Sequence, residues 1–247
     1  MLHFLSRQKT TLMKTVSSYR PKCEEVPQAR VLLLGPLHSG KSSFISSVQS
    51  LFNGRVSNRA MVGSFFPTSF TKKVRIHTQK REENTGLVLC DIPGLGDGEV
   101  SGLTLHDILS VIKGHVPEGH KVRASEASFV DLIFPCFLFL QQKNNFALSG
   151  VHQVALLTHV DKVCPKTARD VSEVYRSLSI KETMSKAGAL LGMSTSYIVP
   201  VKNYSSELDL DVNTDVLLLS AVDHILNYAD LFFQDHMPQN TGQKFKL

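Results

Sequence analysis

The stretch GPLHSGKS, residues 35–42, decides which fold this sequence predicts. The run before it, ARVLLLG at residues 29–35, is continuously apolar and ends in glycine, which is typical of a strand buried on both faces of a parallel sheet. Residues 40–52 after it place Phe44, Ile45 and Val48 on one face of a helix. The spacing Gly-x-x-x-x-Gly-Lys-Ser between a buried strand and a helix predicts a phosphate-binding loop.

The residue types within this loop suit an anionic ligand. Glycines allow backbone N–H groups to curl around a β-phosphate, and the helix N-terminus adds a positive dipole. We expect Lys41 to reach the β- and γ-phosphates and the Ser42 hydroxyl to bind Mg²⁺. The alternative is a strand-to-helix turn that binds no ligand. The expected ligand contacts of the loop are Gly35, His38, Ser39, Gly40, Lys41, Ser42 and Ser43.

Strands and helices alternate along the rest of the chain. Residues 72–79 have the pattern of an edge strand, and residues 86–92, 153–158 and 196–201 have that of buried strands. Helices are expected over residues 168–191, in two pieces, and from Asp211 or Val212 to about Phe233. This order predicts an α/β fold of the P-loop NTPase, GTPase-like class, with a mainly parallel central sheet and helices on both faces. We assign residues 29–233 to this domain, residues 1–28 to a linker or peripheral helix, and residues 234–247 to a flexible C-terminal tail.

A second motif, DIPG at residues 91–94, follows the second buried strand. There Asp91 is expected to hold Mg²⁺ through water and the Gly94 N–H to meet the γ-phosphate, so that the following loop senses the nucleotide. A threonine just before the edge strand should close on the γ-phosphate and Mg²⁺, and we prefer Thr71 to Thr68 because Thr71 directly precedes that strand. A strand-end turn and a structural threonine are the simpler alternatives. The predicted metal contacts are Ser42, Thr71 and Asp91.

A third motif, THVD at residues 158–161, ends the next buried strand. The Asp161 carboxylate is suited to accept hydrogen bonds from the guanine N1–H and 2-amino group, and because adenine lacks this donor pair, the motif favours GTP and GDP over ATP. The alternative is that this strand end only caps a helix. His159 replaces the lysine whose stem would flank the base. The predicted base-side contacts are Thr158, His159 and Asp161, with Lys202 and Asn203 touching the base from the other side.

Leu95 bears on whether the bound nucleotide is cleaved. It follows Gly94, where many small GTPases place the glutamine that orients the attacking water. A leucine side chain cannot orient water, so we expect hydrolysis of GTP to GDP and phosphate to be slow or to depend on a partner. Leu95 is equally well explained as a hydrophobic switch residue, and the sequence leaves open whether the protein is an enzyme.

Composition excludes several other classes. The chain has 27 Lys and Arg against 22 Asp and Glu, but its first thirty residues hold six basic and two acidic side chains, so the body is nearly neutral and nucleic-acid binding is not expected. The four cysteines show no CxxC pair, which favours a reducing, cytoplasmic location over a zinc site or a disulfide framework. The longest apolar run, residues 132–140, is too short for a transmembrane segment.

Three stretches together resemble the interferon-induced protein 44 family of GTPase-like proteins. They are GPLHSGKSSF, THVD after VALL, and NYSSELDLDVNTDVLLLSA from Asn203 onward, and the resemblance runs from about Ser18 to Phe233. It implies a cytoplasmic, GTP-binding protein induced in antiviral innate immune responses, without implying hydrolysis. Longer members of the family carry an N-terminal domain of the TLD type, which we expect this chain to lack.

The middle of the chain departs from this family pattern. Residues 129–140 are suited to a further central strand, yet only residues 141–150 remain for the crossover to the next strand, and a parallel crossover needs a dozen or more residues. We therefore expect a sheet shortened between the third strand and the guanine-specificity strand. The hypotheses are a GTP-binding switch or assembly protein, with self-association suggested by analogy, and a pseudo-GTPase interaction module without turnover. An ATP-dependent or nucleotide-kinase enzyme would require an Arg-rich lid, and the sequence shows no such segment.

Overall fold

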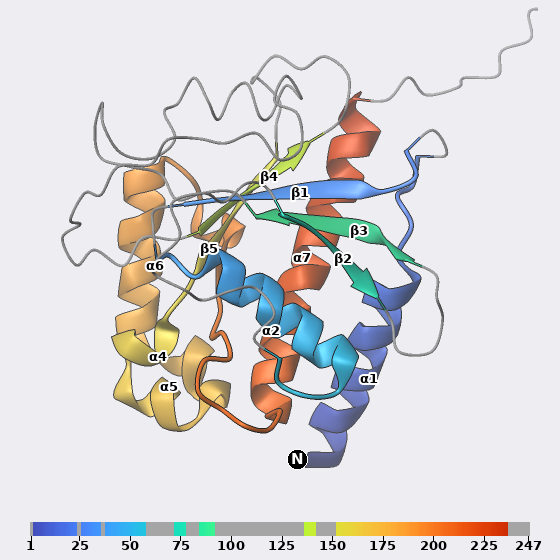
Figure 1. Cartoon of the computed structure of the whole chain (residues 1–247). Coiled ribbons are helices and arrows are strands. Elements are labelled where there is room, and N and C mark those ends of the chain that lie inside the picture. The colour runs from blue at the N-terminus through green and yellow to red at the C-terminus, as the bar shows by residue number, and fades with distance from the viewer. Residues whose placement is uncertain are drawn as a thin grey trace, which may run out of the picture.

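The computed structural model centres on a sheet with the strand order β2-β3-β1-β4-β5-β6 (Figure 1). It describes residues 2–23, 26–35, 38–57, 72–77, 84–91, 136–141 and 152–236. Within these residues the strands are β1 (Ala29–Leu34), β2 (Lys72–His77), β3 (Asn84–Asp91), β4 (Cys136–Gln141), β5 (Gln153–Leu157) and β6 (Ile198–Pro200). The α-helices are α1 (Leu2–Ser18), α2 (Lys41–Asn53), α4 (Val160–Val163), α5 (Pro165–Arg169), α6 (Leu178–Leu191) and α7 (Val212–His236), and short 3₁₀ helices span Val171–Arg176 and Thr195–Tyr197.

Strand direction places four strand ends at one edge of the sheet. β1 pairs in parallel with β3, and β5 with β6. β4 lies between β1 and β5 and runs antiparallel to both, so β1 and β5 point the same way. The edge strand β2 is antiparallel to β3. The carboxyl ends of β1, β3, β5 and β6 therefore lie at one edge of the sheet, the usual position of ligands in open α/β sheets.

The direction of β4 explains how the short middle of the chain is accommodated. Phe137 pairs with Leu34 and with Ala155, so β4 enters the sheet at the carboxyl edge and leaves it at the opposite one. An antiparallel neighbour is joined by a short connection, whereas a parallel neighbour needs a crossover. The expectation of a mainly parallel sheet is correct for β1, β3, β5 and β6 and wrong for β2 and β4, which run in the opposite direction.

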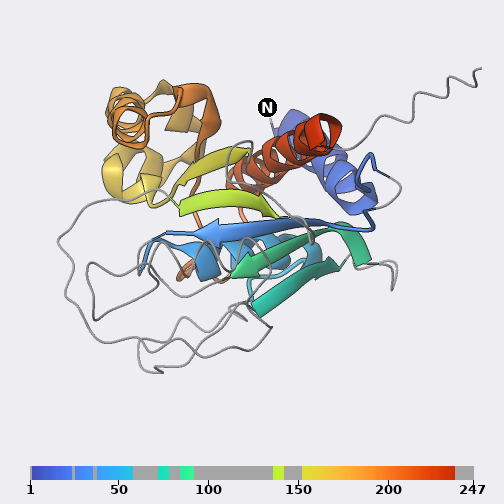
Figure 2. The same cartoon turned by 90° about the horizontal axis from the view of Figure 1, so that it is seen from above.

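Helices cover both faces of the sheet, as the sequence predicts. α1, α2 and α7 pack together on one face, with α1 lying beside α7 in both views (Figures 1 and 2). α4, α5 and α6 pack on the opposite face at the β5–β6 end. Strand β5 shows the division, because Val154 and Leu156 belong to the first core and Ala155 and Leu157 to the second.

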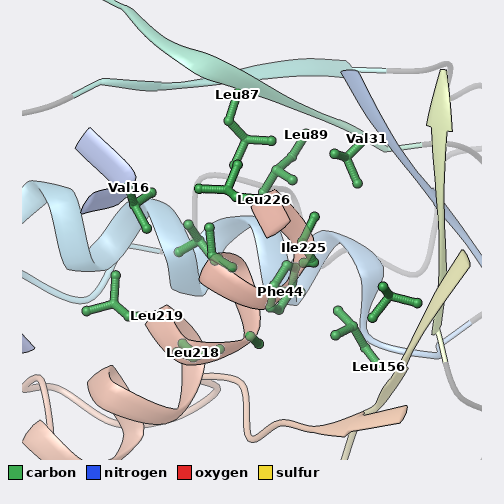
Figure 3. Packing of buried hydrophobic residues seen from close by; sticks show 14 of the residues in the cluster. Val16, Val31, Phe44, Leu87, Leu89, Leu156, Leu218, Leu219, Ile225 and Leu226 are labelled. Atoms are coloured by element: carbon green, nitrogen blue, oxygen red, sulfur yellow. The ribbon is translucent and has the colours of Figure 1, made fainter. Parts of the chain in front are cut away.

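The larger core joins the sheet to α2 and α7. Val31, Leu87 and Leu89 point from the strands toward Phe44 and Ile225 (Figure 3), and all five side chains are buried. Of the described helices, α7 is the one that is long and apolar enough to cross a membrane, but 61% of its apolar window is buried inside the molecule. Packing on the sheet accounts for that burial, and the absence of a transmembrane segment stays a prediction.

Element boundaries differ from the expected ones in three places. The helical stretch expected from Ala168 comprises the end of α5, the 3₁₀ helix Val171–Arg176 and α6. β6 has three residues, because the 3₁₀ helix Thr195–Tyr197 precedes it. α1 is the peripheral helix expected before the sheet, but Val16 is fully buried in the larger core, so this helix is packed on the domain.

Candidate functional site

The loop after β1 has the backbone that its glycines predict. Gly40 has φ 86° and His38 has φ 63°, both in the left-handed region. A Cβ atom at Gly40 would lie 2.9 Å from Asn203 Nδ2, so the position needs glycine for space as well as for conformation. Helix α2 begins directly after Gly40 and carries no side-chain cap. Its first N–H groups therefore point toward the loop without a capping side chain.

Lys41 brings a positive charge into this loop. Its side chain is only 6% exposed, and its Nζ donates a hydrogen bond of 2.9 Å to the Gly35 carbonyl. Nζ also lies 3.4 Å from Ser39 Oγ. A lysine side chain is rarely this buried unless its charge is compensated by hydrogen bonds, an ion pair or a bound ligand. The ammonium thus lies between the two ends of the loop, at the N-terminus of α2.

Ser42 and Asp91 meet at the ends of two neighbouring parallel segments. Asp91 ends β3, where it pairs with Leu33 of β1, and its Oδ2 accepts a hydrogen bond from Ser42 Oγ. A hydroxyl and a carboxylate are the oxygen donors that Mg²⁺ prefers. Two of the three predicted metal contacts therefore adjoin one another, while Thr71 lies outside the described residues, as do Thr68, Gly94 and Leu95.

The end of β5 is bonded to the same loop. Thr158 is fully buried, and its Oγ1 donates a 2.8 Å hydrogen bond to the Ser39 carbonyl. His159 has φ 56°, and its Nε2 lies 3.2 Å from the His38 carbonyl. His159 precedes α4 without a side-chain cap, so the alternative that this motif only caps a helix does not describe the contacts of Thr158. Asp161 lies half-buried in the first turn of α4, with no hydrogen bond to the loop among the described residues.

The segment after β6 makes a further contact with the loop through Asn203. Its Nδ2 donates a 3.1 Å hydrogen bond to the Gly40 carbonyl, and because a carbonyl only accepts, this contact fixes the orientation of the amide. Asn203 Oδ1 is then buried and accepts no hydrogen bond from any described residue. A buried acceptor of this kind favours a ligand that brings a donor.

Lys202 is engaged differently from the expectation. Its Nζ forms a 3.0 Å ion pair with Glu207. Burial raises the pKa of Glu207, but hydrogen bonds from the Ser205 N–H and from Lys202 outweigh it and lower that pKa to about 2. The structure therefore directs Lys202 into a local ion pair, and its predicted contact with a base stays a prediction.

Tyr204 supports the loop after β1 through its contacts with α2 and α7, and none of the sequence motifs indicates this role. The Tyr204 N–H donates to Ser47 Oγ of α2 at 2.8 Å, and the Tyr204 hydroxyl donates to Asp215 Oδ1 of α7 at 2.7 Å. Tyr204 lies in the segment whose sequence resembles the family, but nothing in that sequence pattern indicates these hydrogen-bond partners.

Together, the described contacts gather cationic, hydroxyl and carboxylate groups at one sheet edge, which fits a phosphorylated ligand with a divalent cation. No cluster of three or more His, Cys, Asp or Glu side chains suited to a metal occurs within the described residues.

Comparisons with known proteins place the chain among similar sequences. No protein-family model and no solved structure matches it. It is 31% identical to interferon-induced protein 44-like of Homo sapiens over 266 aligned positions, which cover 95% of this chain and 59% of that protein. It is also 31% identical to interferon-induced protein 44 of Mus musculus, covering 94% of this chain and 61% of that protein, and 32% identical to interferon-induced protein 44 of Homo sapiens, covering 92% and 58%. The chain thus spans about three fifths of the length of these relatives.

The chain lacks some residues that its relative has within the aligned region. Because 95% of 247 residues is about 235, about 31 of the 266 aligned positions have no residue of this chain opposite them. The chain is therefore shorter than its relative within the matched region itself.

Proposed function

The chain belongs to the interferon-induced protein 44 family, and from this premise we propose that it binds GTP with Mg²⁺ and acts in the interferon-induced, antiviral innate immune response. The relatives' names supply induction by interferon, whereas the nucleotide is argued from the residues of this chain. The proposal includes a P-loop NTPase, GTPase-like fold and a cytoplasmic location.

One observation carries the proposal: side chains from three strand ends bond to the loop that follows β1. Asp91 from β3 contacts Ser42, Thr158 from β5 contacts Ser39, and Asn203 from beyond β6 contacts Gly40. A strand-to-helix turn without a ligand does not need this convergence. Holding the loop before the ligand arrives lowers the ordering cost of binding.

The residues divide between phosphate and cation. A bound GTP–Mg²⁺ supplies a triphosphate and a divalent charge to this edge. Lys41 and the N-terminus of α2 present positive charge to the phosphates. Ser42 offers a hydroxyl ligand to Mg²⁺, and its contact with Asp91 keeps a carboxylate within reach of the same ion, directly or through water.

Base choice rests on two acceptors from neighbouring strands. Asp161 carries a carboxylate in the first turn of α4. Asn203 carries the buried oxygen Oδ1, which accepts no hydrogen bond from any described residue. Guanine offers donors at N1 and at the 2-amino group, whereas adenine presents an acceptor at N1. This donor pattern supports GTP and GDP over ATP. His159, which contacts the loop, fills the place of the usual lysine.

Turnover is a separate matter, because Leu95 stands where the water-orienting glutamine is common. We propose slow or partner-dependent hydrolysis, with a pseudo-GTPase interaction module as the second candidate. Phosphate release from purified protein, measured across a range of protein concentrations, separates the two, because self-association that completes the site would make the rate per molecule rise with concentration. A rate indistinguishable from buffer at every concentration favours the pseudo-GTPase.

The shortened sheet fits the same proposal. The alignment leaves about 31 positions of the relative without a counterpart in this chain, which supports an internal loss. β4 pairs antiparallel with both β1 and β5, so the sheet stays continuous in the shorter chain. The loop contacts involve β1, β3, β5 and β6, and none of them depends on β4.

The test is binding of labelled GTP in the presence of Mg²⁺ to the chain and to Lys41→Ala. The proposal predicts saturable binding that falls at least about a hundredfold in the variant, because a charge-assisted contact with two phosphates is lost. Lys181→Ala is the matched control, since Lys181 is exposed on α6, away from the loop, and should bind as the unmodified chain does. Equal affinity in Lys41→Ala, with an unchanged melting temperature, would remove the phosphate-loop assignment.

A further inference from the structure

Helix α7 carries two buried carboxylates, each shared by a lysine and a tyrosine from the rest of the chain. Asp215 Oδ2 lies 2.6 Å from Lys9 Nζ, and its Oδ1 accepts from the Tyr204 hydroxyl. Asp230 Oδ2 lies 3.2 Å from Lys22 Nζ, and its Oδ1 accepts from the Tyr19 hydroxyl at 3.0 Å. The two clusters have the same chemistry, and 15 residues of helix place them about 22 Å apart along α7.

The first cluster connects α1 to the candidate site. The Asp215 side chain is 1% exposed and that of Lys9 is 27% exposed, so the ion pair is largely withdrawn from water. The Tyr204 hydroxyl also accepts a 2.8 Å hydrogen bond from the Asp211 N–H, which fixes the start of α7. Burial, followed by the hydrogen bond with Asp215, raises the pKa of Tyr204 well above its usual value, so the hydroxyl stays a donor.

From Tyr204 the contacts continue into the loop after β1. The Tyr204 N–H donates to Ser47 Oγ, and Ser47 Oγ donates in turn to the Ser43 carbonyl in the first turn of α2. The neighbouring Asn203 holds the Gly40 carbonyl. Holding the ring and the backbone of Tyr204 in place therefore also holds the neighbouring Asn203, whose side-chain amide donates to the Gly40 carbonyl.

The second cluster does not reach the site. Lys22 is 64% exposed, and Tyr19 and Lys22 belong to the segment after α1, where the Tyr19 carbonyl accepts from the Gly86 N–H of β3. Gly86 lies at the start of β3, opposite the carboxyl edge. This cluster fastens the N-terminal segment to the sheet and has no described contact with the loop.

We propose that Tyr204 and the Lys9–Asp215 ion pair are positioning residues for the nucleotide site: through Asn203 they set the loop after β1, so that α1 controls nucleotide affinity. The inference rests on the proposed function. It assigns a ligand-dependent role to α1, whose described connection to the site runs through Asp215 and Tyr204.

The test measures the dissociation constant of a fluorescent GTP analogue with Mg²⁺, at a temperature well below melting, for Tyr204→Phe and Tyr19→Phe. Each substitution removes one hydroxyl from a buried aspartate of α7 and keeps the ring. We expect affinity to fall about threefold to tenfold in Tyr204→Phe and to stay within about twofold in Tyr19→Phe, while both lower the melting temperature. Lys9→Met should weaken binding as Tyr204→Phe does, and Lys9→Arg, which keeps the charge, should restore it.

The outcomes separate this inference from the proposed function. If the unmodified chain binds no nucleotide, both fall. If it binds, and Tyr204→Phe binds equally well while its melting temperature drops as in Tyr19→Phe, the cluster only stabilises the fold and the positioning inference is wrong. Should Tyr204→Phe not fold, Lys9→Met and Lys9→Arg decide the matter, because unchanged affinity in Lys9→Met overturns it equally.

Discussion

Replacing Gly40 with alanine tests how tightly the loop after β1 is packed. The new Cβ would lie 2.9 Å from Asn203 Nδ2 and 3.5 Å from Thr158 Cβ, and φ 86° is unfavourable for any side chain. The left-handed backbone costs about 1–2 kcal/mol, and disruption of the Asn203 hydrogen bond adds about 1 kcal/mol. We expect a loss of about 2–3 kcal/mol in the free energy of unfolding.

Gly192→Ala is the matched control for that experiment. Gly192 has φ 65°, but a Cβ there meets nothing within 4 Å, so the substitution isolates the backbone cost of about 1–2 kcal/mol. In a chain of this size each kcal/mol lowers the melting temperature by about 2–4 °C. Thermal melting and GTP titration of both variants should show the larger temperature loss and the affinity loss in Gly40→Ala alone. Equal losses of stability with unchanged affinity would refute the packing of Asn203 on the loop.

Three further predictions concern neighbouring residues. Asp161→Asn should shift preference from guanine toward xanthine nucleotides, which competition between GTP and XTP measures. Thr158→Val should cost about 1–3 kcal/mol in urea unfolding, because it leaves the buried Ser39 carbonyl without its donor. The folded-state pKa of Glu207, about 2, lies below the ordinary 4.5, so its stabilisation is present above pH 4.5 and is lost as the pH falls from 4.5 toward 2. The urea midpoints of the unmodified chain and Glu207→Gln should therefore converge across that range.

Much of the site was predictable because its residues follow strands in short motifs. Residues 35–42 lie between an apolar run and a helix, so the positions of Lys41 and Ser42 follow from local sequence. The contact between Ser42 and Asp91 follows as well, because parallel strands bring their carboxyl ends to one edge. These predictions needed only strand periodicity and strand direction.

The rest depended on pairings that no local pattern specifies. The apolar residues 136–141 predict a strand without its direction, so the antiparallel β4 could not be read from them. Lys9 and Asp215 are about 200 residues apart, and a buried ion pair between two helices leaves no periodic trace in either. Lys202 carries the same sequence signal whether it faces a base or pairs with Glu207.

A calorimetric titration of the chain with GTP, GDP and ATP in the presence of Mg²⁺ tests directly whether this protein binds a guanine nucleotide. We expect saturable binding of GTP and GDP, at least about tenfold weaker binding of ATP, and loss of GTP affinity when EDTA removes the cation. Absence of saturable binding by GTP, or equal affinity for ATP, would contradict this expectation.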